Sequence, residues 1–91
     1  MSTLTSDQIK KALRTVPKWA RQAGAITCTY QFKDFVAAMA FVNKVARLAE
    51  KAQHHPDIDI RWNKVKLTLS THDQGGLTEK DFDLARKFDA L

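Results

Sequence analysis

The sequence predicts an α+β domain with the element order αββαββα, in which a four-stranded antiparallel sheet has its helices packed on one face. Two pairs of short segments alternate apolar and polar residues, the period of a half-buried strand, and each pair is joined by a short connection typical of a hairpin. Three other segments carry apolar residues at helical spacing. Because 91 residues suffice for one core, we expect a single domain over residues 1–91.

The first helix is expected to begin at Thr5 and to end at Pro17. Thr5 and Gln8 have the spacing of a capping box, in which each side chain bonds the backbone amide of the other residue. An apolar stripe runs from Ile9 to Val16, and Pro17 stops the helix.

The first hairpin is predicted between residues 19 and 32. A short strand around Trp19–Arg21 leads into a turn at residues 22–24. The longer strand that follows has apolar residues at every second position, namely Ile26, Cys28, Tyr30 and Phe32.

The longest helix is expected from Asp34 to about Gln53. Its apolar residues form two rows, one of Phe35, Met39, Val42, Ala46 and Ala49 and one of Phe41, Val45 and Leu48. An apolar surface this broad should pack against two elements, the sheet and another helix. Because the core of so short a chain is also marginal alone, we expect a homo-oligomer.

A second hairpin and a last helix complete the domain. The third and fourth strands are joined at Asn63-Lys64, and their apolar positions are Ile58, Ile60, Trp62, Val65, Leu67 and Leu69. Gly75-Gly76 marks a loop before a helix that begins at Thr78. The apolar positions of this helix are Phe82, Ala85, Phe88 and Leu91. The face of the sheet away from the helices is polar, so it is either exposed to solvent or part of a subunit contact.

Composition restricts the partners and the compartment. The net charge is +5, but the 15 Lys and Arg residues are scattered among 10 acids, as on a solvated surface, so we expect no specific nucleic-acid binding. The single cysteine, Cys28, fits a reducing compartment. No apolar run approaches the ~20 residues that cross a bilayer, and the first residues lack the pattern of a signal peptide. We therefore expect a cytoplasmic protein without membrane contact.

All three histidines fall at the ends of predicted elements. His54 and His55 follow the longest helix and precede Pro56, which helps to end it, and His72 ends the fourth strand. Rigid elements hold such positions in place while leaving them exposed, which suits functional residues. We therefore predict a functional site formed by His54, His55 and His72.

Two chemistries compete at this site. Three imidazoles can hold zinc and leave a fourth position open, but adjacent side chains diverge and no carboxylate or thiol pattern supports a metal site. Acid–base chemistry fits better, because imidazole titrates near neutrality and one ring can donate a proton while another accepts one. We therefore predict catalysis without a metal.

The histidines belong to a longer pattern. It consists of Phe32-Lys33-Asp34-Phe35, Ala49-Glu50-Lys51, His54-His55-Pro56, Trp62, Asn63-Lys64-Val65, Thr71-His72-Asp73, Gly75-Gly76-Leu77-Thr78 and Asp81, with Trp19 and Gly24 before it. Over nearly the whole chain this pattern closely resembles the pterin-4a-carbinolamine dehydratases. It departs from them at residues 58–60, a stretch that is often aromatic or asparagine-containing in that family, and at Trp62, where tyrosine is common.

The resemblance implies a dehydratase that needs no cofactor. Its substrate would be a 4a-hydroxytetrahydropterin, produced when an aromatic amino acid hydroxylase turns over, and its products would be quinonoid dihydropterin and water, supporting tetrahydropterin recycling. The resemblance assigns His54 and His72 to acid–base duty and His55 mainly to holding the pterin. It also implies a homodimer or homotetramer.

We predict three further substrate-binding residues beside His55. Glu50 precedes His54 by one helical turn and either orients an imidazole or is a charged residue in solvent. Asp81 matches the last aspartate of the family pattern and also suits the first turn of a helix. Trp62 could stack on the pterin, although we favour a core position on the sheet.

The alternative function is a protein-interaction module. Some members of the family also act as dimerisation partners for a transcription factor, so the fold can serve as a coactivator-like device without required catalysis. The presence of all three histidines favours the enzyme, because a scaffold would not need them.

Overall fold

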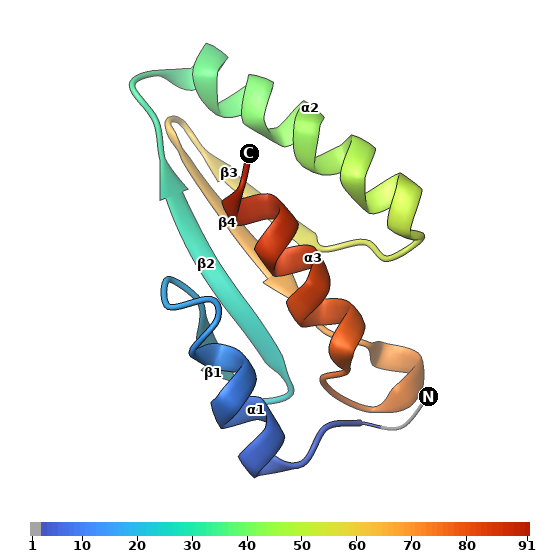
Figure 1. The fold of residues 1–91 in the computed structure, drawn as a ribbon. Coiled ribbons are helices and arrows are strands. Elements are labelled where there is room, and N and C mark those ends of the chain that lie inside the picture. The colour runs from blue at the N-terminus through green and yellow to red at the C-terminus, as the bar shows by residue number, and fades with distance from the viewer. Residues whose placement is uncertain (1–2) are drawn as a thin grey trace.

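The computed structural model describes residues 3–91 and contains the predicted elements in the predicted order. They are α1 (Ser6–Leu13), β1 (Ala20–Gln22), β2 (Ala25–Gln31), α2 (Phe35–Ala52), β3 (Asp57–Arg61), β4 (Lys64–Leu69), the short 3-10 helix η1 (His72–Gln74) and α3 (Glu79–Asp89). All three α-helices lie on the same side of the sheet (Figure 1). The predicted fold class is therefore confirmed.

The sheet has the strand order β1-β2-β4-β3, and every neighbouring pair is antiparallel. Both hairpin turns have two residues, because Gln22 pairs with Ala25 and Arg61 pairs with Lys64. The second turn therefore contains Trp62, with a positive φ of 51° and 66% of its surface exposed. The prediction of a core position for Trp62 is wrong, because the tight turn takes this residue out of the alternation of β3.

The capping box of α1 is confirmed. The amide of Gln8 donates to the Thr5 hydroxyl at 3.2 Å, and the amide of Thr5 donates to the Gln8 side chain at 2.8 Å. The predicted end of the helix is wrong, since α1 stops at Leu13 rather than at Pro17. The residue before a proline is pushed out of the α conformation, so the chain leaves the helix through tighter turns that still bury Val16 completely.

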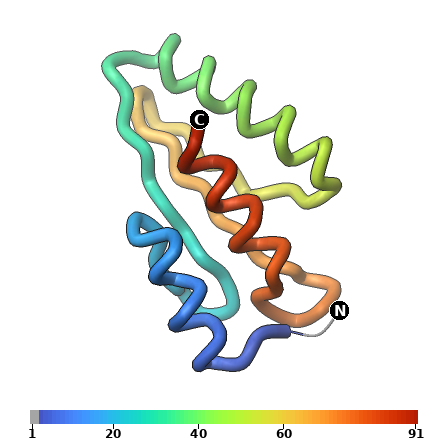
Figure 2. The backbone as a smooth tube through the Cα atoms, viewed as in Figure 1, coloured from blue at the N-terminus to red at the C-terminus, as the bar shows by residue number. Residues whose placement is uncertain are grey.

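The core lies between the sheet and the helices. Its buried residues include Val16, Trp19, Ile26, Cys28, Phe41, Val45, Val65, Leu67, Leu69, Phe82, Leu84, Ala85 and Phe88. Leu91 is not among them: it lies beyond the end of α3 and is 46% exposed, so its predicted place on the apolar face of that helix is wrong. The segment before α1 passes beside the loop before α3, where the amide of Leu4 donates to the carbonyl of Leu77 at 2.9 Å (Figure 2).

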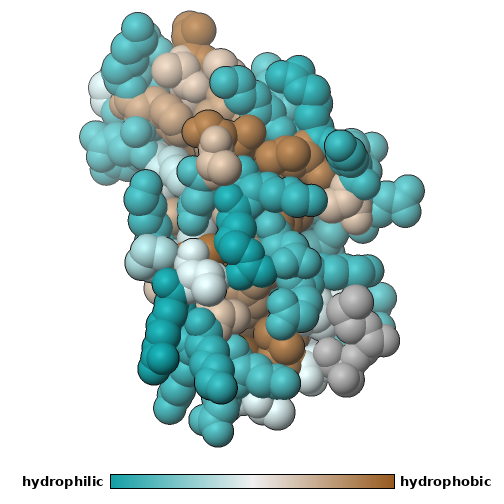
Figure 3. Space-filling view, in the orientation of Figure 1, coloured by the Kyte–Doolittle hydropathy of each residue, from teal (hydrophilic) through white to brown (hydrophobic). Residues whose placement is uncertain are grey.

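Helix α2 contacts both β4 and α3, as its broad apolar surface predicted. In one row Phe41 and Val45 are buried and Leu48 is half-buried, whereas much of the other row is half-buried or exposed. Phe35 is 49% exposed and Val36 is 76% exposed. Hydrophobic residues are exposed along α2 and between α2 and α3, while the region over α1 is largely hydrophilic (Figure 3). This single chain therefore leaves part of the apolar surface of α2 uncovered.

The open face of the sheet is polar, as expected. Its side chains are half-buried or exposed and include Thr27, Thr29, Gln31, Lys66 and Thr68. In the described part of the chain, residues 3–91, no helix combines the length and the apolar character needed to cross a bilayer.

A polar contact inside this fold predicts how stability depends on pH. The Tyr30 hydroxyl and the Trp19 indole N–H both donate to Oδ1 of Asp89, which ties the end of α3 to the sheet. Burial, together with the bond to Asp89, raises the pKa of Tyr30 far above its usual range. A raised pKa contributes stability that is complete below the ordinary tyrosine value of about 10 and is lost as the pH rises above it.

We expect the free energy of unfolding to fall above pH ~10, and to fall less steeply in Tyr30→Phe. The contribution of Tyr30 to the slope should stay below about 1.4 kcal/mol per pH unit, the limit for one proton, because the phenol is partly solvated. Urea denaturation between pH 8 and 11 measures both proteins. Burial also raises the pKa of Cys28, and because its thiol interacts with the Tyr30 side chain, the difference between the two slopes reports Tyr30 together with its effect on Cys28. Equal slopes would contradict the prediction.

Candidate active site

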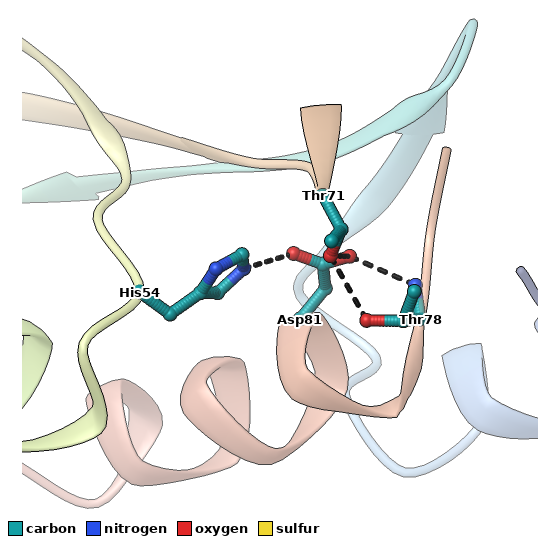
Figure 4. A network of polar contacts seen from close by, with 4 residues as sticks. All are labelled: His54, Thr71, Thr78 and Asp81. Carbon is teal, nitrogen blue, oxygen red and sulfur yellow. Dashed lines mark hydrogen bonds and ion pairs between the residues drawn. The ribbon is translucent and has the colours of Figure 1, made fainter. Parts of the chain in front are cut away.

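Asp81 is the centre of a buried polar network. It stands in the first turn of α3 and is completely buried. Its Oδ2 atom accepts hydrogen bonds from the Thr71 hydroxyl and from the Thr78 amide, both at 2.9 Å. Its Oδ1 atom lies 2.6 Å from Nε2 of His54 (Figure 4). The carboxylate thus joins the end of β4, the start of α3 and the segment after α2.

The same network sets the orientation of the His54 ring. Asp81 accepts its two other hydrogen bonds at Oδ2, and we assign the contact at Oδ1 to Nε2–H of His54 as donor and the carboxylate as acceptor. The other ring nitrogen, Nδ1, is then free to accept a proton. The His54 side chain is 12% exposed, so it retains access to solvent. A buried carboxylate behind an imidazole can stabilise the positive charge that the ring acquires on protonation.

The backbone before His54 explains where this ring lies. Gln53 has a left-handed conformation with φ 52°, and the amide of His54 donates to the carbonyl of Ala49 at 3.1 Å. This is the hydrogen-bond pattern of a Schellman ending. The helix therefore ends at Ala52 through this turn, four residues before Pro56. The turn directs His54 toward α3.

Glu50 and His55 form a second pair. Nε2 of His55 contacts Oε2 of Glu50, and the two side chains are 62% and 76% exposed, respectively. The structure thus places Glu50 against the ring of His55, and its role in orienting an imidazole stays a prediction. Helix geometry alone does not identify this ring, because the left-handed turn at Gln53 reverses which of the two histidines faces Glu50.

His72 lies in a tight loop beyond the last strand. It begins η1 rather than ending β4, which stops at Leu69, so its predicted place on the strand is wrong. A bridge between Thr71 and Gly76 closes the loop, and Gly75 adopts a φ of 80°, a conformation that suits glycine. The exposed ring of His72 lines a cavity of about 370 Å³ on the open face of the sheet.

The structure does not bring the three histidines into one cavity. His54 lines a different, smaller cavity of about 130 Å³, together with Lys80 and Lys87. The link between His54 and His72 runs through Asp81 and Thr71, because Thr71 bonds Asp81 and precedes His72 in the chain. Trp62 is not part of this arrangement.

Trp62 follows β3, whereas His55 precedes it. The five residues of β3 separate the two by about 16 Å at the usual rise of a strand.

Thr71 and Thr78 are members of the network whose role sequence reasoning missed. Their hydroxyls lie 2.9 Å apart, and since that of Thr71 donates to Asp81, that of Thr78 is the donor between them. A signal was present, because Thr71 continues the inward-facing series of Val65 and Leu67 on β4. A polar residue at such a position needs a buried partner.

The described residues, 3–91, contain no group of three or more His, Cys, Asp or Glu side chains placed to hold a metal ion. Two of the three imidazoles, those of His54 and His55, are instead each paired with one carboxylate. Such pairs can move a proton and stabilise the charge that moves with it.

Comparisons with known proteins agree on one family. A family model described as pterin 4 alpha carbinolamine dehydratase matches residues 2–91. A protein of Acidobacterium capsulatum with the name pterin-4-alpha-carbinolamine dehydratase is 59% identical over 91 residues, which cover 100% of this chain and 99% of that protein. A protein of the same name from Thermomicrobium roseum is 54% identical and is covered over 98% of its length.

Solved structures show the same fold. A crystal structure from Brucella melitensis, described as a transcriptional coactivator/pterin dehydratase, superimposes with a TM-score of 0.94 at 40% identity and covers 98% of this chain and 97% of that one. A pterin dehydratase-like protein described as a RuBisCO assembly factor in the alpha-carboxysome is 23% identical, with a TM-score of 0.65 over 79% of this chain and 83% of that one. The second likeness shows the fold alone.

Proposed function

Because this chain belongs to the pterin 4 alpha carbinolamine dehydratase family, we propose that it removes water from a 4a-hydroxytetrahydropterin. The product is the quinonoid dihydropterin, which a reductase can return to the tetrahydropterin. The observation that carries the proposal is the hydrogen bond from His54 to the buried carboxylate of Asp81, which leaves Nδ1 of His54 as a proton acceptor.

The reaction needs one proton donor and one proton acceptor. The C4a–O bond breaks, the departing hydroxyl takes a proton to leave as water, and the pterin ring loses a proton from a nitrogen. No atom is oxidised or reduced from outside, so protons alone complete the balance and neither a metal nor a cofactor is required. We assign the acceptor role to His54, because Asp81 stabilises the imidazolium.

His72 is assigned as the donor to the departing hydroxyl, because its ring lines the larger cavity. His55, held by Glu50, is assigned to binding the pterin rather than to proton transfer. Asp81 is completely buried behind His54, so it acts as a positioning residue and does not touch the substrate. These roles replace the expectation that Asp81 and Trp62 bind the pterin directly.

A dehydration assay tests the proposed function. A hydroxylase generates the 4a-hydroxytetrahydropterin in situ, and the loss of its absorbance is followed with and without this protein at ~0.15 M salt. Positioned acid–base groups should accelerate the reaction by ~10²–10⁴-fold over buffer. A rate equal to that in buffer would refute the proposal.

We also propose that the chain works as a homodimer or homotetramer in a reducing, cytoplasmic compartment. The uncovered apolar surface of α2, with Phe35 and Val36 exposed, supports self-association. The same surface supports the second candidate function, a coactivator-like interaction module, which the description of the Brucella melitensis structure suggests.

The mass in solution should be two or four times 10.3 kDa at micromolar concentration. Val36→Glu places a charge on the uncovered surface and should lower that mass, whereas Lys10→Glu, on exposed α1, should not. Light scattering measures all three proteins. A 10.3 kDa wild type would contradict self-association.

A further inference from the structure

The cavity that His72 lines has a second ionisable side chain. Of the described residues around it, only His72 and Asp57 carry ionisable groups, and Thr68 and Ser70 add hydroxyls. Its volume of about 370 Å³ lies in the range of small-molecule sites, whereas the 130 Å³ beside His54 does not. The larger cavity is therefore the one that can hold a bicyclic ring.

Asp57 is placed at this cavity by the register of the sheet. It is the first residue of β3 and pairs with Thr68 of β4, so both side chains stand on the open face. One wall is closed where the turn between β1 and β2 meets the loop of His72: a Cβ atom on Gly24 would lie 4.0 Å from Cα of Gly76.

The carboxylate of Asp57 has no partner within the described chain, residues 3–91, since it makes neither a hydrogen bond nor an ion pair there. Asp59, two residues further along the same strand and on the same face, contacts Arg61 at 3.5 Å. Asp57 is thus a free acceptor at a cavity, and Asp59 is a paired acid outside it.

The chemistry of a pterin matches a free carboxylate. The pyrimidine half of the ring presents its 2-amino group and N3–H side by side, as two parallel donors. A carboxylate offers two acceptor oxygens and binds such a pair of donors in bidentate fashion. A serine or threonine hydroxyl can then serve the 4-oxo group or N1.

We propose that Asp57 binds the 2-amino group and N3–H of the pterin in the cavity lined by His72. This inference deepens the proposed function and rests on it for the identity of the substrate. It makes Asp57 the residue that selects pterins over pteridines with an oxo group at position 2. It also leaves C4a in the same cavity as His72, the histidine that lines it.

The test compares two ligands and three proteins. Calorimetric titration measures the dissociation constants of 7,8-dihydropterin and of 7,8-dihydrolumazine, which has a 2-oxo group in place of the 2-amino group. Wild type should bind the dihydropterin at least ~10-fold more tightly. The 2-oxo group of dihydrolumazine and the carboxylate of Asp57 are both acceptors, so they cannot form a hydrogen bond with each other. In Asp57→Asn the preference should reverse, since the amide can donate to the 2-oxo group and accept from N3–H.

Asp59→Asn is the matched control and should keep the wild-type preference. A gain of dihydrolumazine binding in Asp57→Asn could not come from misfolding. An unchanged preference in Asp57→Asn, with a wild type that dehydrates its substrate, would overturn this inference alone. A wild type that prefers dihydropterin, loses that preference in Asp57→Asn but does not dehydrate would support it and overturn the proposed function. Binding of neither ligand to wild type would overturn both.

Discussion

Replacing Asp81 by alanine is expected to lower the free energy of unfolding by about 3–5 kcal/mol, the cost of removing one partner from a buried, charged hydrogen-bond network. The variant leaves the Thr71 hydroxyl, the Thr78 amide and Nε2 of His54 without their acceptor. Two of these groups lie in the interior, where water cannot replace the carboxylate. The turnover number should fall as well, because the His54 ring loses the contact that orients it.

Urea denaturation at pH 7 measures this effect. The control is Asp83→Ala, which removes an acid from the same helix that is 62% exposed and pairs only with Arg86. Its cost should stay below about 1 kcal/mol, as for exposed ion pairs in general. An Asp81→Ala variant as stable as Asp83→Ala would show that the network does not hold α3 to the sheet.

Removing the proposed proton-transfer groups is expected to reduce catalysis. His54→Ala and His72→Ala should each lower kcat at least ~10-fold, because each deletes one half of the acid–base pair. His55→Ala should mainly raise KM, because its role is to bind the pterin. The assay is the dehydration of 4a-hydroxytetrahydropterin over a range of substrate concentrations.

Trp62→Ala is the control for these variants. Its side chain is the most exposed aromatic described, and β3 separates it from His55. We expect activity close to that of wild type. If the double variant at His54 and His72 dehydrates as fast as wild type, the assignment of the site is wrong.

Local patterns predicted most of the fold. The alternation along β2 and β4 and the two apolar rows of α2 each depend on residues close in the chain, and burial of one face suffices to specify them. The errors occurred where the chain leaves an element. Trp62 is in a turn because the connection between β3 and β4 has only two residues. Helix α1 ends before Val16 because Pro17 follows that residue.

The sequence by itself determined the fold class and the candidate residues of the site, namely the three histidines, Glu50 and Asp81. Only the tertiary structure decided their partners: Asp81 bonds His54, and Glu50 bonds His55. The physical reason is that these contacts depend on how α2 and α3 pack and on the left-handed turn at Gln53. Spacing along the chain specifies the face of an element, but a hydrogen bond between residues 27 positions apart forms only after the two elements have packed.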